Sequence, residues 1–115
     1  DHLIMSVLWY QKSAEMKALY YQTFNIAKLR LDQELEKNNS ERQKAVIVDI
    51  DETMLDNSPF ETNCIRTGKG FTNDRWNEWT SKIAATALPG AVEFSQYAKS
   101  KNVDVFYISI MIFCF

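Results

Sequence analysis

The sequence predicts an α/β fold in which helices come first and two parallel strands follow. Three observations predict it. No glycine or proline precedes Pro59, apolar residues recur every three or four positions before Leu35, and two short apolar runs flank a helical pattern. A strand, a helix and a second strand in this order begin a right-handed crossover in a parallel sheet. We expect one domain, helical over residues 1–38, with a βαβ-type core over residues 45–115.

The N-terminal helical region is expected to form one long helix or two. Residues 2–37 are rich in good helix formers, and Ser13 is suited to cap a second helix that carries Glu15 in its first turn. One face is apolar and is expected to pack in the core; it consists of Met16, Tyr20, Phe24, Ala27, Leu31 and Leu35. The polar run at residues 36–44 then serves as a linker.

The rest of the chain alternates between strand-like and helix-like patterns. The β-branched, uncharged run before Asp49 is typical of a buried parallel strand. The elements are expected in this order: a strand at 45–48, a loop or cap at 56–70 within a loop or cap region at 56–88, helices at 74–84 and 91–101, and a second strand at 103–108.

The composition limits what the protein can be. Its 115 residues are 46% hydrophobic, which indicates one globular domain with a buried core. A formal charge of −2 gives no long-range attraction toward polymeric nucleic acid or an anionic membrane. The only histidine of the sequence is His2, which argues against histidine-rich zinc sites and Ser-His-Asp catalysis. Any catalysis is therefore expected to depend on carboxylates.

Two acidic residues directly follow the first apolar run. Asp49 and Asp51 therefore lie at the carboxyl end of the expected strand, where open α/β sheets bind ligands. Two converging carboxylates repel each other unless a cation lies between them, and hard oxygen ligands suit Mg²⁺. One carboxylate can attack phosphorus while the other protonates the leaving alkoxide. Acidic residues after a strand also occur as helix caps or solvated loops, so the triplet alone does not decide the chemistry.

The segment AVIVDIDETMLDNSPF resembles the first motif of the haloacid dehalogenase superfamily, in which D-x-D-x-T follows the first central strand. Within that superfamily, residues 7–109 resemble the bacterial class C acid phosphatases. This narrower resemblance is carried by WYQKSAEMKALYYQTFNIAKLRLD, DNSPF, DRWNEW and LPGAVEFSQYAKSKNVDVFYIS. It implies the N-terminal portion of a Rossmann-like haloacid dehalogenase fold, with N-terminal helices and two parallel strands of a truncated sheet.

The resemblance implies a role for each of several residues. Asp49 becomes the nucleophile that forms an aspartyl-phosphate and also a Mg²⁺ ligand, and Asp51 becomes the general acid and base, with its backbone carbonyl on the Mg²⁺ ion. Thr53 supports the loop by hydrogen bonding, and Ser109 binds the transferring phosphoryl group. Trp76 stands where such enzymes stack a nucleotide base on an aromatic ring.

Core packing is the alternative role for Trp76, and both roles stay open. Core packing is the expected role of Trp79, three residues later.

The implied activity is a Mg²⁺-dependent acid phosphatase that acts on phosphomonoesters, with nucleoside 5'-monophosphates as candidate substrates. Members of the family are secreted, periplasmic or lipid-anchored. A periplasmic protein or outer-membrane lipoprotein is therefore expected, and its signal and lipid anchor would lie outside these 115 residues. The alternative is a non-catalytic helical interaction module, in which residues 2–37 dock on a partner.

The sequence departs from the family after Ser109. The family continues with Asn-Arg, whereas this chain reads Ile-Met-Ile-Phe-Cys-Phe, and no third-motif lysine or fourth-motif acidic residues follow. We therefore expect a truncated product that is weakly active or inactive and whose residues 110–115 are in doubt as family sequence. Because ISIMIFCF is apolar, uncharged and β-prone, deleting Ile110 to Phe115 is expected to improve solubility.

Overall fold

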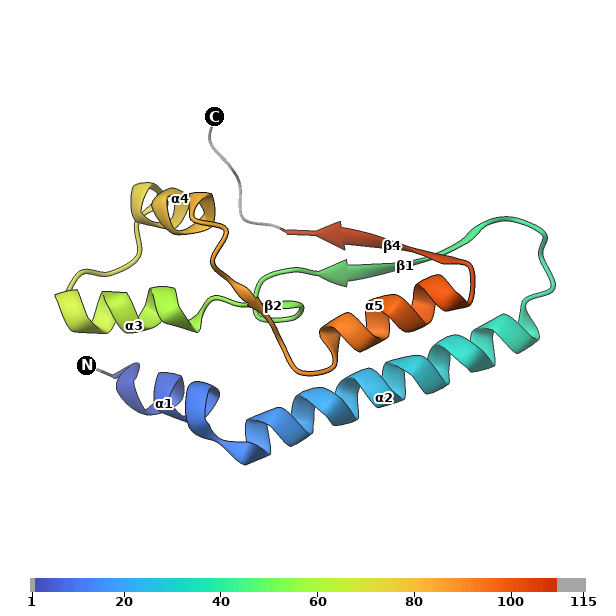
Figure 1. The fold of residues 1–115 in the computed structure, drawn as a ribbon, viewed down its shortest axis with the longest axis horizontal. Helices are drawn as coiled ribbons and strands as arrows, with labels where there is room; N and C mark the ends of the chain where they lie inside the picture. The colour runs from blue at the N-terminus through green and yellow to red at the C-terminus, as the bar shows by residue number, and fades with distance from the viewer. Residues whose placement is uncertain (1, 110–115) are drawn as a thin grey trace.

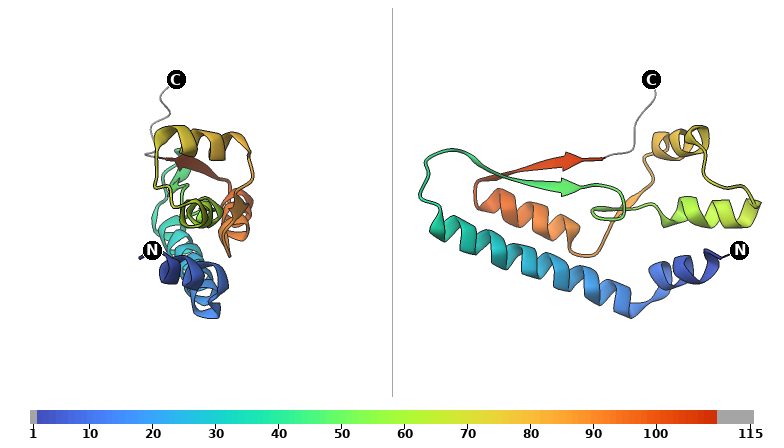
Figure 2. Two further views of the ribbon diagram at one scale, coloured as in Figure 1. Left: turned by 90° about the vertical axis from the view of Figure 1, so that its left-hand side faces the viewer. Right: turned by 180° about the vertical axis from the view of Figure 1, so that it is seen from behind.

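The computed structural model describes residues 2–109 and has an α/β architecture. Its elements are α1 (Ile4–Lys12), α2 (Ala14–Lys37), β1 (Lys44–Asp49), β2 (Leu55–Asp56), α3 (Ser58–Thr67), α4 (Asn73–Ser81), β3 (Thr86–Ala87), α5 (Ala91–Ser100) and β4 (Val103–Ile108). In Figure 1, β1 and β4 form one layer, and α2 and α5 lie along the same side of it. Helices α1, α3 and α4 lie at the end of the molecule that is far from the connection between α2 and β1, as Figure 2 also shows.

The N-terminal helical region consists of two helices, which settles the alternative that the sequence left open. Ser13 has an extended backbone with ψ of 129°, and its side chain accepts hydrogen bonds from the backbone N–H groups of Glu15 and Met16. A serine hydroxyl group at this position satisfies donors that have no partner within the helix. The expected cap therefore divides the region into α1 and α2.

Strands β1 and β4 pair in parallel, as expected, from Lys44 opposite Val103 to Asp49 opposite Ile108. Alternate β1 side chains, among them Val46 and Val48, point toward α2 and α5, because side chains alternate between the faces of a strand. On the other face Ile47 is 71% exposed. The short strands β2 and β3 form a separate antiparallel pair.

Two apolar clusters make up the core of residues 2–109. The first joins α2 to the sheet and contains Phe24, Met54, Ala91 and Phe94. The second joins α3 to α4 and contains Phe60, Cys64 and Trp76, with Trp79 packed against it. The first cluster includes Met54, which belongs to the turn that follows β1.

Of the loop or cap expected over residues 56–70, the loop alternative was wrong, because α3 occupies most of that range. Its proline lies in the first turn, where a missing N–H group costs nothing and the fixed φ suits a helix. Phe60 and Cys64 are four residues apart, so they share one face and bury it against Trp76. The cap region 56–88 therefore contains the two helices α3 and α4.

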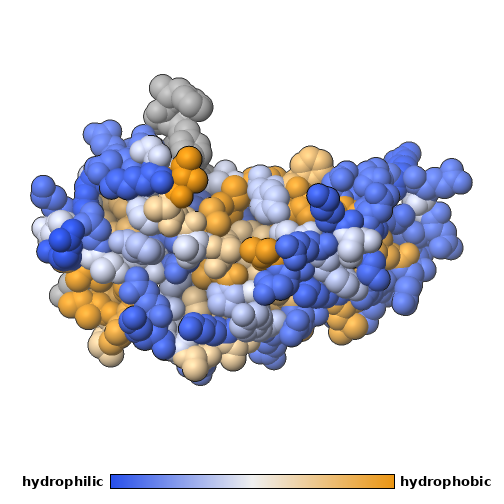
Figure 3. Space-filling model, viewed as in Figure 1, coloured by the Kyte–Doolittle hydropathy of each residue, from blue (hydrophilic) through white to orange (hydrophobic). Residues whose placement is uncertain are grey.

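The surface differs along the length of the molecule. Figure 3 shows hydrophilic side chains crowded at the end where α2 leads into β1. This end contains the polar run at residues 36–44 that was expected to be a linker. Apolar side chains gather over α1, where Met5 is 72% exposed. No helix within residues 2–109 is long and apolar enough to span a membrane.

Candidate active site

The turn after β1 places the two aspartates of the D-x-D triplet. Asp49 is the last residue of β1, and the backbone carbonyl of Ile50 accepts hydrogen bonds of 2.9 Å from the N–H groups of both Met54 and Leu55. The chain reverses within this turn because Glu52 takes the left-handed conformation, with φ of 55°. The turn therefore holds its acidic residues at the carboxyl edge of the sheet.

Asp49 has a hydrogen-bond partner within the same turn. The Thr53 hydroxyl group donates to the Asp49 Oδ2 atom at 2.9 Å. Asp49 lies on the open face of the sheet, since the alternate residues of β1 face the helices. Thr53 thus holds the Oδ2 atom of the Asp49 carboxylate in place, and this also fixes the direction of its Oδ1 atom.

Asp51 is held by residues from two distant parts of the chain. Ser109, which directly follows β4, donates through its hydroxyl group to the Asp51 Oδ2 atom at 2.7 Å. The Asn57 side-chain amide donates to the Asp51 Oδ1 atom at 2.9 Å. The fold therefore brings Asp51 and Ser109 together although 58 residues separate them in the sequence.

Asn57 and Glu52 belong to this hydrogen-bond network, and the sequence analysis did not single them out. The backbone N–H of Asn57 donates to the Glu52 carboxylate at 3.0 Å. Partial burial raises the pKa of Glu52, the bond from Asn57 opposes this shift, and the nearby Asp51 charge adds to it. The available signal was the asparagine in DNSPF, two residues before a proline in the first turn of a helix.

The two tryptophans of α4 have different surroundings. Trp76 is 7% exposed and meets the Phe60 ring edge to face, with 5.2 Å between centroids. Its core-packing role is confirmed, whereas base stacking stays a prediction. Trp79 packs against the same cluster and also donates its indole N–H to the Asn57 Oδ1 atom at 2.9 Å. Trp79 therefore connects the core to the aspartates.

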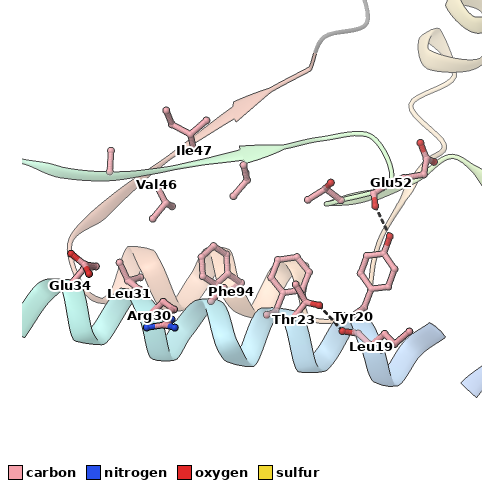
Figure 4. A pocket seen from close by; sticks show the side chains of 15 residues that line it. Leu19, Tyr20, Thr23, Arg30, Leu31, Glu34, Val46, Ile47, Glu52 and Phe94 are labelled. Atoms are coloured by element: carbon pink, nitrogen blue, oxygen red, sulfur yellow. Dashed lines mark hydrogen bonds between the residues drawn. The ribbon is translucent and has the colours of Figure 1, made fainter. Parts of the chain in front are cut away.

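A small pocket of about 220 Å³ lies beside Asp51 and Ser109. Its walls are mostly apolar and include both Trp76 and Trp79. A larger groove of about 700 Å³ runs between α2 and β1 and includes Thr53 but neither aspartate. Figure 4 shows its apolar walls, with Phe94 and Leu31 below Val46. The smaller pocket, which is lined by Asp51 and Ser109 but not by Asp49, is therefore the candidate place for the leaving group of a substrate.

The carboxylates suit a divalent cation in their chemistry. Asp49 and Asp51 provide hard oxygen atoms of the kind that Mg²⁺ prefers. Within residues 2–109, however, no group of three or more His, Cys, Asp or Glu side chains is arranged to hold a metal ion. The described part of the chain thus fits Mg²⁺ in ligand type and supplies part of a coordination shell.

Comparison with known proteins gives consistent matches. A family model described as HAD superfamily, subfamily IIIB (acid phosphatase) matches residues 2–110. The class C acid phosphatase from Bacillus anthracis is 47% identical to this chain, with a TM-score of 0.88. Its tungstate-bound crystal structure gives the same identity and TM-score. The match covers 94% of this chain and 45% of that one, so this chain spans less than half the length of the relative.

Proposed function

Because the chain belongs to the acid phosphatases of HAD subfamily IIIB, we propose that the protein hydrolyses phosphomonoesters through an aspartyl-phosphate intermediate. One observation carries the proposal. Asp49 and Asp51 lie at the carboxyl edge of two parallel strands, and Ser109 from the neighbouring strand bonds Asp51 there. This edge is where open α/β sheets bind their ligands.

The hydrogen bonds suggest a division of labour between the aspartates. Because Thr53 donates to Asp49 Oδ2, the Asp49 Oδ1 atom is the one available to attack phosphorus. The new bond joins this oxygen to phosphorus, the ester P–O bond breaks, and Asp51 gives its proton to the leaving alkoxide. Asp51 then takes a proton from the water molecule that attacks the aspartyl-phosphate, which releases inorganic phosphate and restores Asp49.

Phosphatases of this superfamily generally use a divalent metal. We propose Mg²⁺ for this protein, held by the Asp49 carboxylate and the backbone carbonyl oxygen of Asp51, because hard oxygen atoms are its preferred protein ligands. An ion held there would offset the negative charge of the phosphoryl oxygen atoms. We propose that the Ser109 hydroxyl group turns from Asp51 to donate to the transferring phosphoryl group when a substrate binds, and that Thr53 holds the loop.

The pocket beside Asp51 suggests the kind of ester. Its apolar walls and tryptophans suit a planar leaving group, so nucleoside 5'-monophosphates are proposed substrates. The exposed part of Trp79 is better placed than the buried Trp76 to meet such a group. By family resemblance, we also propose a periplasmic location or an outer-membrane lipoprotein.

Hydrolysis of a fluorogenic phosphomonoester at mildly acidic pH, with and without Mg²⁺, tests the proposal. The assay needs high sensitivity, because the described residues supply only part of a metal shell and slow turnover is expected. Asp49→Asn should abolish the Mg²⁺-dependent turnover, whereas Asp104→Asn, on the exposed face of β4, should leave it intact. Turnover that persists in Asp49→Asn would rule out this nucleophile. A folded, monodisperse sample without turnover would overturn the proposed activity and mean that this chain is an inactive portion of the family.

A further inference from the structure

We propose that Asn57 is a positioning residue that fixes the orientation of the Asp51 carboxylate, and that Trp79 acts through Asn57. The inference rests on the proposed function, since it assigns roles to residues that surround the proposed general acid. It begins with an asparagine that is 4% exposed and lies between three elements of the fold.

Asn57 gives up the role that its position would normally have. It is the N-cap residue of α3, where asparagine side chains commonly accept a hydrogen bond from the first turn of the helix. Here the side chain makes no capping bond. Its amide group donates instead to Asp51 Oδ1 at 2.9 Å, so the side chain serves the carboxylate rather than the helix.

Trp79 determines which end of the amide faces Asp51. An asparagine amide can turn over, which exchanges its oxygen and its NH₂ group. The Trp79 indole N–H can only donate, and it donates to Asn57 Oδ1 at 2.9 Å. The turned-over amide would place two donors against each other and an oxygen against the carboxylate. Trp79 therefore keeps the NH₂ group directed at Asp51.

The backbone of Asn57 is also fully engaged. Its N–H donates to the Glu52 carboxylate at 3.0 Å, and its carbonyl accepts from the Phe60 N–H at 2.9 Å. Because the residue is fixed at both its backbone and its side chain, it can hold Asp51 in one rotamer. With Ser109 on the other carboxylate oxygen, Asp51 accepts one side-chain donor on each oxygen.

A general acid must deliver its proton along a defined direction, so loss of the Asn57 bond should affect the chemical step more than substrate binding. We expect Asn57→Ala to lower kcat by about tenfold or more with KM changed by less than about threefold. Trp79→Phe keeps an aromatic ring but loses the donor, and should lower kcat by about three- to tenfold. Asn25→Ala, on the exposed face of α2, is the matched control and should keep wild-type kcat.

The double variant separates positioning from general packing. If Trp79 acts through Asn57, adding Trp79→Phe to Asn57→Ala should cause no further loss of kcat, because the group that Trp79 orients is already absent. Circular dichroism of each variant confirms that it is folded. Should Asn57→Ala fail to fold, Trp79→Phe decides the matter on its own.

The outcomes distinguish the two proposals. Wild-type protein without Mg²⁺-dependent turnover overturns the proposed function, and the inference falls with it. Active wild-type protein with a folded Asn57→Ala or Trp79→Phe variant within about twofold of its kcat overturns the inference alone. A double variant whose loss of kcat equals the product of the two single-variant losses also overturns the coupling between Trp79 and Asn57.

Discussion

The hydroxyl group of Tyr20, on α2, donates a hydrogen bond to the backbone carbonyl oxygen of Glu52, which lies between Asp51 and Thr53 in the active-site turn. Figure 4 shows this contact at one end of the groove between α2 and β1. Tyr10 reaches the same place from α1, since its hydroxyl oxygen lies 2.8 Å from that of Tyr20. The N-terminal helices therefore support the turn that carries the proposed nucleophile.

Tyr20→Phe tests this support. The variant keeps the ring but leaves the Glu52 carbonyl oxygen without its tyrosine donor, so we expect the free energy of unfolding to fall by about 1 kcal/mol. Urea denaturation measures the change. Tyr21→Phe is the matched control, because Tyr21 is 49% exposed on the outer side of the same helix. Equal stability of the two variants would show that the hydroxyl group contributes nothing.

Thr53 offers a test of how the proposed nucleophile Asp49 is held. Thr53→Val has nearly the same shape but no donor for Asp49 Oδ2, so we expect kcat to fall by about tenfold or more. Thr53→Ser keeps the hydroxyl group and should retain most of the activity. Steady-state kinetics with the fluorogenic ester distinguish the two, and a Val variant as active as the Ser variant would contradict the role.

Gly90 is required by both its backbone and its neighbour. Its φ is 83°, and an added Cβ atom would lie 3.0 Å from the Phe24 Cδ2 atom in the first core cluster. We expect Gly90→Ala to lower the free energy of unfolding by more than about 1 kcal/mol.

Two other glycines separate the two effects. Gly68→Ala introduces backbone strain alone, because φ is 65° and no atom lies within 4 Å of the added Cβ atom. Gly70→Ala introduces neither backbone strain nor a close contact. Thermal denaturation should therefore rank the variants Gly70, Gly68, Gly90 from least to most destabilised. The reverse order for Gly68 and Gly90 would argue against the Phe24 contact.

The contact between Tyr10 and Tyr20 makes the free energy of unfolding depend on pH in the alkaline range. Burial, and next the hydrogen bond with Tyr20, raise the pKa of Tyr10 well above its ordinary value of 10.0. The folded protein therefore holds this proton more tightly than the unfolded chain. The resulting stabilisation is present below about pH 10 and is lost as the pH rises above it.

Tyr10→Phe should consequently reduce the loss of stability between about pH 8 and about pH 11. Urea denaturation of the wild type and the variant at both values measures this difference. An unchanged loss in the variant would mean that Tyr10 does not contribute to the alkaline transition.

The fold could be predicted largely because its signals are local. Ser13 could be identified as a helix cap, and the β-branched run before Asp49 as a strand, from neighbouring residues alone. The helix over residues 58–67 was missed because its asparagine, serine and proline, and the glycines that follow it, are typical of loops, while only two apolar residues mark its buried face. Packing against Trp76 stabilises a segment whose composition does not favour a helix.

The candidate site was predictable only in part for the same reason. Asp49 and Asp51 follow a strand, and this position is visible in the sequence. Asn57 could be recognised only from the structure, in which its side chain bonds both Asp51 and Trp79. Asn57 lies at the N-terminus of α3, whereas Trp79 lies within α4. Trp79 was expected in the core, and its N–H group could not be assigned a partner until the fold was known.

The bond between Ser109 and Asp51 has a consequence for biosynthesis. A ribosome that has just completed the D-x-D turn soon supplies Thr53 and Asn57, so the partners of Asp49 Oδ2 and Asp51 Oδ1 emerge almost at once. Ser109 emerges 58 residues after Asp51, and the intervening chain must close a long loop before the two can meet. A nascent chain therefore contains the proposed nucleophile well before Ser109 can donate to Asp51, so this contact of the proposed general acid forms late in synthesis.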